Sequence, residues 1–427
     1  MQYEVSEFVL KSGGRGLIVN VPGASVMSTQ FHFRAGDRFV KNAAQKWETA
    51  HIMEHMAFGA NRDFNSGTEF DTIFTENGAY HNAYTSGTGM GYVATCAGFE
   101  WDRILELQKL VLCYPKFTDE EFKSEYGNVK SELTGYLSDA ERVLWPKAAQ
   151  LLGDTTLTYQ ERLDLMPNVT VDDVRDHYHR THTAGNLRFV VAGDFTGKLT
   201  KLREILNSFE LIDGDRPPLP VDELHSFAPF VIRRKDVPDI TFGWTMSLSR
   251  RLSDDEDAAM DALNHILNGT LHSRIQGKAR EKGLIYGIWS DTSAGEHNSS
   301  WDFGAAVEPE KLNKVFDLIV REITRIQDGD LSESEIDSAK KYALGRHQMG
   351  IQTVGQINNW LANRYFFDGR IEDFAAQPAR INNITRERII DTARDFFDSN
   401  CWGLGLYGNT DKTTADRLQE KLGKLFK

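Results

Sequence analysis

The chain has 427 residues, of which 40% are hydrophobic and 26% are charged, and its formal net charge is −13 at pH 7. This composition is typical of a globular protein with enough residues for two or three domains. The acidic balance argues against nucleic acid and against an anionic membrane surface as partners. No apolar run approaches the roughly 18 residues that a membrane span needs.

Targeting signals and disulfides are not expected. The first residues, Met1 to Glu7, contain neither a basic region followed by an apolar one nor an Arg-rich presequence, so we expect a cytoplasmic protein. Three cysteines, at Cys96, Cys113 and Cys401, are odd in number and widely spaced. We therefore expect reduced thiols in the core.

Alternating apolar residues and turn signals predict a strand at the start of each half of the chain and several more behind it. Strands are predicted at 16–21, 26–33, 91–96, 230–232 and 240–246. The first two are expected to pair around the turn at Pro22 and Gly23, and the last two repeat this opening. Helical patterns between the strands predict an α+β fold, in which helices cover one face of a mostly antiparallel sheet in each half.

The run His51-Ile52-Met53-Glu54-His55 lies in a helical segment that is apolar on nearly all sides and that Gly59 is placed to stop. Residues four apart share a face of a helix, so His51 and His55 can present two imidazoles to one point, with Glu54 beside it. Two imidazoles need a third protein ligand to form a catalytic zinc site with one position open for water. The alternative is a set of core residues hydrogen-bonded to one another.

A second helix is predicted from Thr118, which would cap it together with Glu121. Glu125 and Glu132 are two turns apart on this helix and therefore share a face. Either residue could complete a metal site, but a solvated acidic face is an equally ordinary interpretation of this segment alone.

The two halves of the chain repeat one pattern. At a spacing of 215 residues, Asn168-Val169-Thr170 and Gly193-Asp194 reappear as Asn383-Ile384-Thr385 and Gly408-Asn409. At a spacing of 210, Glu54 aligns with Asn264 and His51 with Asp261, so only the first half should bind metal. We predict a metal-binding catalytic domain at 1–212, a linker at 213–225 and a homologous domain without metal ligands at 226–427.

These residues resemble the pitrilysin or insulinase-type zinc metallopeptidases, which include the mitochondrial processing peptidases. The resemblance spans nearly the whole chain: 31–38 precedes the H-x-x-E-H run, and 77–85 is similar to the family's G-x-x-N-A-x-T strand. The family usually has glycine three residues before the first histidine, whereas this chain has Glu48.

The resemblance implies the remaining site residues. Glu132, 77 positions after His55, matches the family's third metal ligand, and Glu125 matches its accessory acid. It further implies that the second domain supplies Arg280 and Tyr286 to the active site. Asn82, Ala83, Tyr84 and Thr85 are expected to form an exposed edge strand that pairs with substrate backbone.

We therefore expect a zinc-dependent endopeptidase with one Zn²⁺ per chain, held by His51, His55 and Glu132, and with Glu54 as general base. The resemblance implies unfolded peptides as substrates, enclosed in a chamber of which this chain forms half. It implies a homodimer, with a heterodimer containing a related subunit as the alternative.

Two rival hypotheses stay open at this stage. One is a non-catalytic or partner-dependent subunit of the same fold. The other places a metal on His177, His179 and His182, although histidines two apart point to different faces of a helix.

Overall fold

The computed structural model describes residues 2–426 and divides into two compact units. The first unit takes the chain up to Gly135 together with Gln160–Pro220 and Met349–Glu372. The second takes Tyr136–Tyr159, Val221–Gln348 and the chain from Asp373 onward. The chain passes from the first unit to the second within the predicted linker at 213–225. Tyr136–Tyr159 of the first half belongs to the second unit, and Met349–Glu372 of the second half belongs to the first. The predicted division at 1–212 and 226–427 therefore does not describe the two units.

The first unit is built on a six-stranded sheet with the order β1-β2-β6-β3-β5-β4. Its strands are β1 (Glu4–Val9), β2 (Arg15–Asn20), β3 (Val26–Phe33), β4 (Tyr80–Thr85), β5 (Met90–Ala97) and β6 (Arg188–Gly193). All neighbouring strands are antiparallel except β2 and β6. β6 is a nearly continuous apolar run because it lies in the middle of the sheet with both faces covered. β4 alternates exposed and half-buried residues because it lies at the edge.

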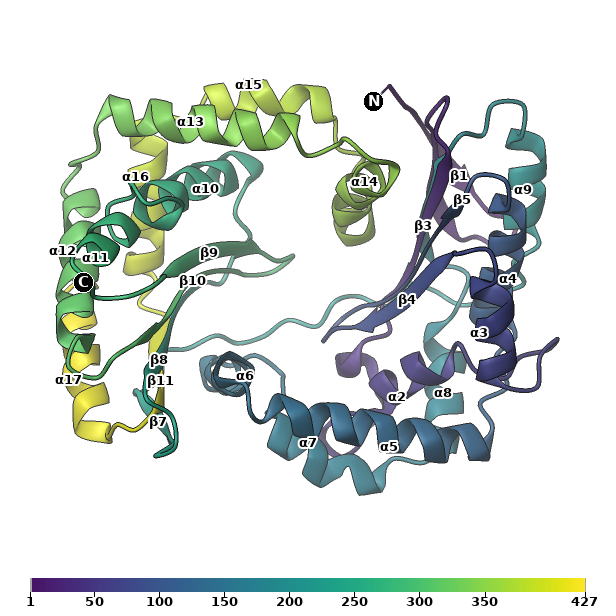
Figure 1. The fold of residues 1–427 in the computed structure, drawn as a ribbon, viewed down its shortest axis with the longest axis horizontal. Coiled ribbons are helices and arrows are strands. Elements are labelled where there is room, and N and C mark those ends of the chain that lie inside the picture. The colour runs from purple at the N-terminus through teal and green to yellow at the C-terminus, as the bar shows by residue number, and fades with distance from the viewer. Residues whose placement is uncertain (1, 427) are drawn as a thin grey trace. The chain divides into compact units, whose positions relative to one another are not determined.

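Helices cover both faces of this sheet (Figure 1). They are α1 (Ala43–Lys46), α2 (Thr49–Met56), α3 (Gly67–Thr75), α4 (Trp101–Cys113), α5 (Asp119–Tyr136), α7 (Tyr159–Leu165), α8 (Val171–Thr181), α9 (Leu199–Asn207) and α14 (Val354–Asp368), with 3₁₀ turns at Asp37–Phe39 and Met166–Asn168. Helix α14 comes from late in the chain and packs on β3 and β6. Its buried Asn358 donates hydrogen bonds to the carbonyls of Ser28 and Val190.

The second unit repeats this plan on a five-stranded sheet with the order β7-β11-β8-β10-β9. Its strands are β7 (Phe230–Arg233), β8 (Ile240–Leu248), β9 (Trp289–Ala294), β10 (Ser299–Val307) and β11 (Trp402–Gly408). Its helices are α6 (Ala140–Leu152), α10 (Asp254–Asn268), α11 (Gln276–Glu281), α12 (Leu312–Gln327), α13 (Glu333–Gln348), α15 (Gln377–Asn382), α16 (Arg386–Asp398) and α17 (Lys412–Gly423), with a 3₁₀ turn at Phe374–Ala376. The one parallel pair among its described strands, β7 with β11, corresponds to β2 with β6. The predicted α+β fold is therefore confirmed, and the two sheets share the strand pairing that the predicted duplication requires. The prediction that helices cover only one face is wrong for the first sheet, because α14 packs on its other face.

Two local predictions are wrong. The strands at 16–21 and 26–33 do not pair around Pro22, because β6 lies between β2 and β3 and bonds to both. β11 separates β7 from β8 in the same way. The helix of the H-x-x-E-H run ends at Met56, three residues before Gly59, whose amide bonds to the Met56 carbonyl in a tighter final turn.

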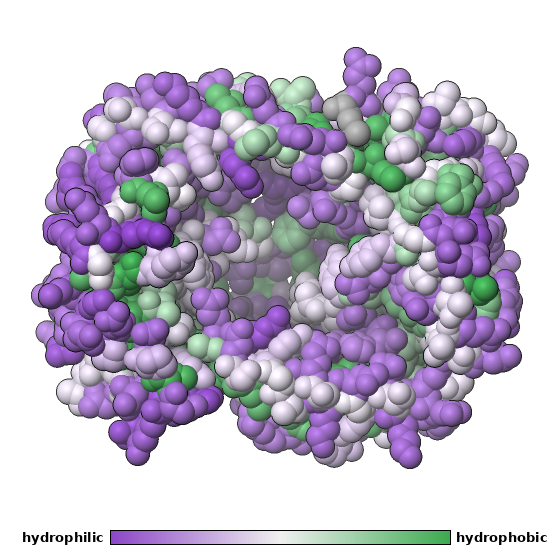
Figure 2. All heavy atoms as spheres, in the orientation of Figure 1, coloured by the Kyte–Doolittle hydropathy of each residue, from purple (hydrophilic) through white to green (hydrophobic). Residues whose placement is uncertain are grey.

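The surface matches an ordinary globular composition. Figure 2 shows a face that is mostly hydrophilic, with hydrophobic side chains in small separate groups. Among residues 2–426, none of the helices combines the length and the apolar composition that a membrane crossing requires. The three cysteines are free thiols, as the sequence predicts; Cys96 and Cys401 are buried, whereas Cys113 is only half-buried.

Candidate metal centre

Helix α2 presents its three chemically active side chains together. Its apolar residues Ile52, Met53 and Met56 are buried, whereas His51, Glu54 and His55 are only partly buried. The helical period places these three on one side because they lie three and four positions apart. Burial of the apolar face therefore fixes where the polar face points.

Helix α5 is held against the loop after α2 by one carboxylate. Thr118 caps α5 by accepting a hydrogen bond from the Glu121 amide at 3.3 Å. The Glu121 carboxylate accepts a hydrogen bond from the Thr118 hydroxyl (3.1 Å) and others from the amides of Ala60 (2.6 Å) and Gly67 (3.2 Å). A side chain at Gly59 would have no room, since a Cβ there would lie 2.8 Å from Glu121 Oε1. This contact sets the register in which α5 faces α2.

The structure brings His51, His55 and Glu132 together. Glu132 Oε2 lies 3.8 Å from His51 Nε2 and 3.5 Å from His55 Nε2. One ligand atom from each of the three residues lies within 4.8 Å of the other two. Bonds of about 2.0–2.1 Å to a single zinc ion would place tetrahedral ligand atoms roughly 3.3 Å apart, so the three residues fit a zinc ion with little movement.

Each of the two histidines is held by a second carboxylate on its other ring nitrogen. His51 Nδ1 lies 3.1 Å from Glu48 Oε2, and His55 Nδ1 lies 3.2 Å from Glu125 Oε2. Because a carboxylate can only accept here, Nδ1 carries the proton and Nε2 keeps its lone pair toward Glu132. The carboxylate of Glu48 is fully buried and is also bonded to Arg162.

Glu48 was not identified as a functional residue from the sequence, where it counted only as a departure from the family pattern. One feature of the sequence could have indicated a role for Glu48: it is a charged residue at the start of an otherwise apolar helix. A charged residue that is buried there must find partners. Arg162 lies more than a hundred residues away, so no local pattern points to it.

The charges of this pair are mutually stabilising. Burial raises the pKa of Glu48, but the hydrogen bond with His51 and the Arg162 guanidinium outweigh burial and lower it. Burial lowers the pKa of His51, and the hydrogen bond to Glu48 with the charges of Glu48 and Glu54 outweighs burial and raises it. Glu48 therefore stays ionised although it is buried, as an acceptor for a metal-binding histidine must.

Glu54 is connected to the predicted substrate strand. The Thr85 hydroxyl donates a hydrogen bond of 2.7 Å to Glu54 Oε2. Thr85 is the last residue of β4, which pairs with β5 on one side only. The other side of β4 is the free edge that the sequence predicts, with Tyr80 58% and Tyr84 43% exposed. Asn82 is exposed and Ala83 half-buried on the same strand.

Arg280 and Tyr286 belong to the second unit and lie together within it. The Arg280 guanidinium donates a hydrogen bond of 3.1 Å to the Tyr286 carbonyl and lies 4.7 Å from the centre of the Tyr286 ring. The Tyr286 side chain is 84% exposed. Both groups are therefore free to meet a ligand at the surface of their unit.

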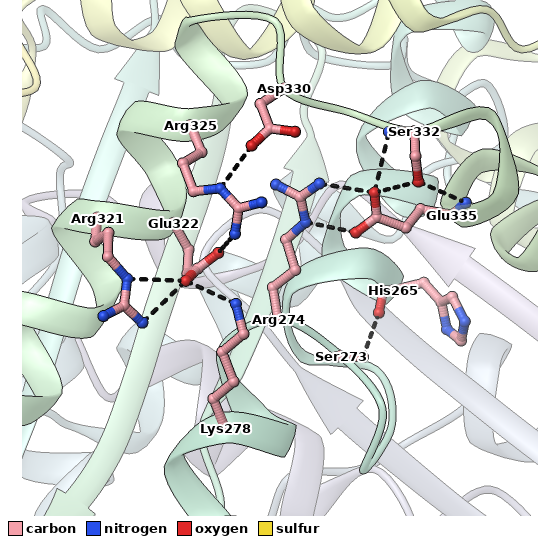
Figure 3. Close-up of polar contacts among 10 residues, drawn as sticks. All are labelled: His265, Ser273, Arg274, Lys278, Arg321, Glu322, Arg325, Asp330, Ser332 and Glu335. Carbon is pink, nitrogen blue, oxygen red and sulfur yellow. Dashed lines mark hydrogen bonds and ion pairs between the residues drawn. The ribbon is translucent and has the colours of Figure 1, made fainter.

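The helix that carries Arg280 is anchored by two ion pairs (Figure 3). Lys278 of α11 donates a hydrogen bond of 2.9 Å to Glu322 of α12, which also binds Arg325 at 2.8 Å. Arg274, just before α11, binds both oxygens of Glu335 on α13 at 2.6 and 2.7 Å. Two bonds in parallel fix orientation as well as distance.

The alternative histidine site is not assembled. His177 Nε2 lies 2.8 Å from the Ala35 carbonyl, whereas His182 Nε2 lies 2.8 Å from the Tyr92 hydroxyl. Burial lowers the pKa of His177 and of His182. In the part of the chain that the structure describes, the group of His51, His55 and Glu132 is the only one of its kind.

Comparisons with known proteins agree on one family. The model described as "Insulinase (Peptidase family M16)" matches residues 43–152, and the model described as "Peptidase M16 inactive domain" matches residues 168–342. Together they cover more than half of the chain. The first range contains α2 and α5, and the second covers most of the predicted copy without metal ligands.

Individual relatives are distant but similar in length. A zinc protease of Streptomyces coelicolor, described as uncharacterised, is 22% identical over 384 residues, covering 87% of this chain and 82% of the relative. The β subunit of the mitochondrial processing peptidase of Caenorhabditis elegans is 21% identical over 403 residues, covering 88% and 83%.

Solved structures show the same fold. A protease from Helicobacter pylori has a TM-score of 0.81 at 17% identity and covers 95% of this chain and 100% of its own. A peptidase M16 inactive domain from Pseudomonas fluorescens has a TM-score of 0.81 at 16% identity, with 96% and 98% covered.

The Glu335–Arg274 pair should make a pH-dependent contribution to stability. The hydrogen bonds from Arg274 lower the pKa of Glu335 to about 2. A carboxyl whose pKa is depressed on folding stabilises the protein above its unfolded pKa and loses this effect as the pH falls through its folded pKa. Glu335→Gln should therefore lower the free energy of unfolding at pH 7 by about 1–3 kcal/mol, and by less at pH 3.

Urea unfolding at the two pH values measures this difference. Glu333→Gln, on the same helix but 75% exposed, is the matched control and should change little at either pH. An equal loss at pH 7 and pH 3 for Glu335→Gln would show that the ion pair does not act as described.

Proposed function

Because this chain belongs to the insulinase family of peptidases, peptidase family M16, we propose that it is a zinc-dependent endopeptidase that hydrolyses unfolded peptides. The observation that carries the proposal is the convergence of ligand atoms from His51, His55 and Glu132 within 4.8 Å of one another. Two imidazoles and one carboxylate are a donor set found in catalytic zinc sites, which keep a further position open. The description of the Streptomyces coelicolor relative as a zinc protease supports the choice of metal.

In this proposal the chain provides three ligand side chains that are already oriented for a zinc ion. When bound, zinc would lower the pKa of a coordinated water toward roughly 7 and so make hydroxide available at neutral pH. Glu48 and Glu125 orient the rings of His51 and His55, so that both Nε2 atoms face Glu132 before any ion arrives. Little ordering entropy is then lost on binding.

Glu54 is the general base in this proposal. Its carboxylate lies on the same side of α2 as the two histidines, where it takes a proton from water and later gives it to the leaving amine. The hydrogen bond from Thr85 fixes one of its oxygens, Oε2, and leaves Oε1 for the proton. Arg280 and Tyr286 are proposed, on the resemblance alone, to stabilise negative charge on the carbonyl oxygen of the substrate.

The free edge of β4 supports peptides as the substrate class. An extended peptide can add a strand there through main-chain hydrogen bonds, which do not require a particular sequence. Because Thr85 ends β4 and binds Glu54, a peptide on this edge would reach the general base at one end of the strand. An unfolded segment offers its backbone in this way at any position along its length.

We propose a homodimer as the working assembly. The name of the Caenorhabditis elegans relative, a β subunit, favours a second candidate: a chain that cuts peptides only with a related partner, or that serves such a partner without cutting.

Replacing Glu54 by Gln should abolish peptide cleavage and leave zinc binding nearly unchanged. The amide keeps the size and the hydrogen bond from Thr85 but cannot accept a proton, and loss of a general base typically costs about 10²–10⁴-fold in rate. The measurement is cleavage of a mixture of unstructured peptides, read by mass spectrometry, with zinc content determined on the same samples.

Glu106→Gln is the matched control, because Glu106 lies on α4 and pairs with Lys109 at the surface. Wild type and control should cut, and Glu54→Gln should not. Full activity in Glu54→Gln would contradict the mechanism. If the wild type by itself cuts no peptide, and cleavage appears when a related subunit is added, the second candidate is favoured.

Replacing Glu48 by Gln should weaken zinc binding. An amide can still contact Arg162 or His51, but it has no negative charge to keep the proton on Nδ1 of His51. Loss of such a partner typically costs about 10–100-fold in metal affinity. Competition with a chromophoric chelator measures the dissociation constant. Restoration by Glu48→Asp would support positioning, and an unchanged affinity in Glu48→Gln would remove Glu48 from the site.

A further inference from the structure

Tyr286 lies on a short irregular segment, residues 282–288, that connects α11 to the edge strand β9. Its neighbours Leu284, Ile285 and Ile288 are buried in the core of the second unit, whereas the Tyr286 side chain is 84% exposed. The core therefore fixes the segment on both sides of the tyrosine but does not hold the tyrosine side chain itself.

Glycines flank the exposed part of this segment. Gly283 has a φ of 61°, in the left-handed region that glycine enters without a steric penalty. Gly287 directly follows Tyr286, and a Cβ there would meet no atom within 4 Å apart from its chain neighbours. Gly287 therefore loosens the backbone beside the tyrosine, and the direction of the Tyr286 side chain depends on contacts from outside the segment.

Gln276 of α11 makes such contacts on both sides of Gly287. Its Oε1 accepts a hydrogen bond of 2.8 Å from the Ile288 amide, and its Nε2 donates a longer one of 3.5 Å to the Tyr286 carbonyl. A backbone amide can only donate, so the carbonyl side of Gln276 must face Ile288. One side chain thus bridges the backbone of the two residues that flank Gly287.

Arg280, one turn later on α11, contacts the same part of the segment. Its guanidinium donates a hydrogen bond of 3.1 Å to the Tyr286 carbonyl and lies 4.7 Å from the centre of the Tyr286 ring. Residues four apart share a face of a helix, so Gln276 and Arg280 form one surface. The segment that carries Tyr286 rests on this surface.

Helix α11 is a firm support for Gln276. The turn before it is tight, since a Cβ at Gly277 would lie 2.5 Å from the Leu271 carbonyl oxygen. Arg274 and Lys278 tie this region to α13 and α12 through ion pairs (Figure 3). Because the helix is held by its neighbours, its side chains can fix the position of the segment beside it.

We propose that Gln276 is a positioning residue for Tyr286, which by bridging Tyr286 and Ile288 holds the tyrosine hydroxyl in the orientation that stabilises negative charge on the substrate carbonyl oxygen. It rests on the proposed function, which gives Tyr286 this role. Such a donor must be in place before the reaction, and a displacement of about 1 Å can cost roughly 10²-fold in rate. Gln276 touches no reacting atom and acts only through Tyr286.

Gln276→Met tests this role, because methionine keeps the length of the side chain and removes both hydrogen bonds. We expect kcat to fall about tenfold and KM to change by less than about twofold, since the interaction acts in the transition state. Steady-state cleavage of an unstructured fluorogenic peptide measures both. Glu281→Met is the matched control and should keep wild-type rates, because Glu281 is exposed and lines a cavity with Gly277 and Lys278.

A double-mutant cycle with Tyr286→Phe separates positioning from a general structural role. Once the tyrosine hydroxyl is absent, adding Gln276→Met should lower kcat by less than about twofold, because there is no hydroxyl left to position. A tenfold loss in both backgrounds would show that Gln276 supports the fold independently of Tyr286, and would overturn the proposal.

Hydrogen exchange gives a readout that does not depend on cleavage. Exchange of the Ile288 amide should become about fivefold or more faster in Gln276→Met, because its hydrogen bond is lost, and should be unchanged in Glu281→Met. Unchanged exchange in Gln276→Met would overturn the proposal whether or not the protein cuts peptides.

The two proposals fail in different ways. If the wild type cuts peptides and Gln276→Met cuts them equally fast, the positioning role is overturned and the proposed function stands. If the wild type cuts no peptide although exchange of the Ile288 amide differs, the proposed function fails and the catalytic role of Gln276 fails with it.

Discussion

The hydrogen bonds between each candidate zinc histidine and a carboxylate are the contacts on which the site depends. A histidine ring can rotate and can carry its proton on either nitrogen, so proximity alone does not make a metal site. Glu48 and Glu125 remove both freedoms by accepting the proton of Nδ1. Burying Glu48 completely would be costly without compensation, and Arg162 supplies it. Glu48, which departs from the glycine of the family pattern that the sequence resembles, is thus tied to a distant arginine.

The two units keep the same helix-to-edge contact, but only the first has the candidate metal site. In the first unit Glu54 accepts a hydrogen bond of 2.7 Å from Thr85 on the edge strand, and in the second unit Asn264 donates one of 2.9 Å to Thr292 on β9. The helix-to-edge contact is kept, but an amide cannot take up a proton. His265 is kept as well and is stacked on Tyr342. The second copy keeps the scaffold contact but has an amide in place of the proposed general base.

Sequence reasoning succeeded where one local rule decides the outcome. The spacing of His51 and His55 fixes a shared helix face, and the alternation of exposed residues along β4 fits an edge strand. It failed where distant segments compete: β6 inserts between β2 and β3 from more than 150 residues away, and no hairpin signal at Pro22 can reveal that. For the same reason, the sequence does not indicate that α14 packs within the first unit. The roles of Glu125 and Glu132 needed the family resemblance, because two acids on one helix face are usually solvated.

The most direct test of this account is anomalous diffraction at the zinc edge from crystals of the zinc-loaded protein. The account predicts one strong peak per chain, bonded to Nε2 of His51, Nε2 of His55 and a carboxylate oxygen of Glu132, with both Nδ1 atoms still bonded to Glu48 and Glu125. A peak at another place, or zinc bound through Nδ1 with these carboxylates released, would contradict the claim that histidine–carboxylate pairs prepare the site.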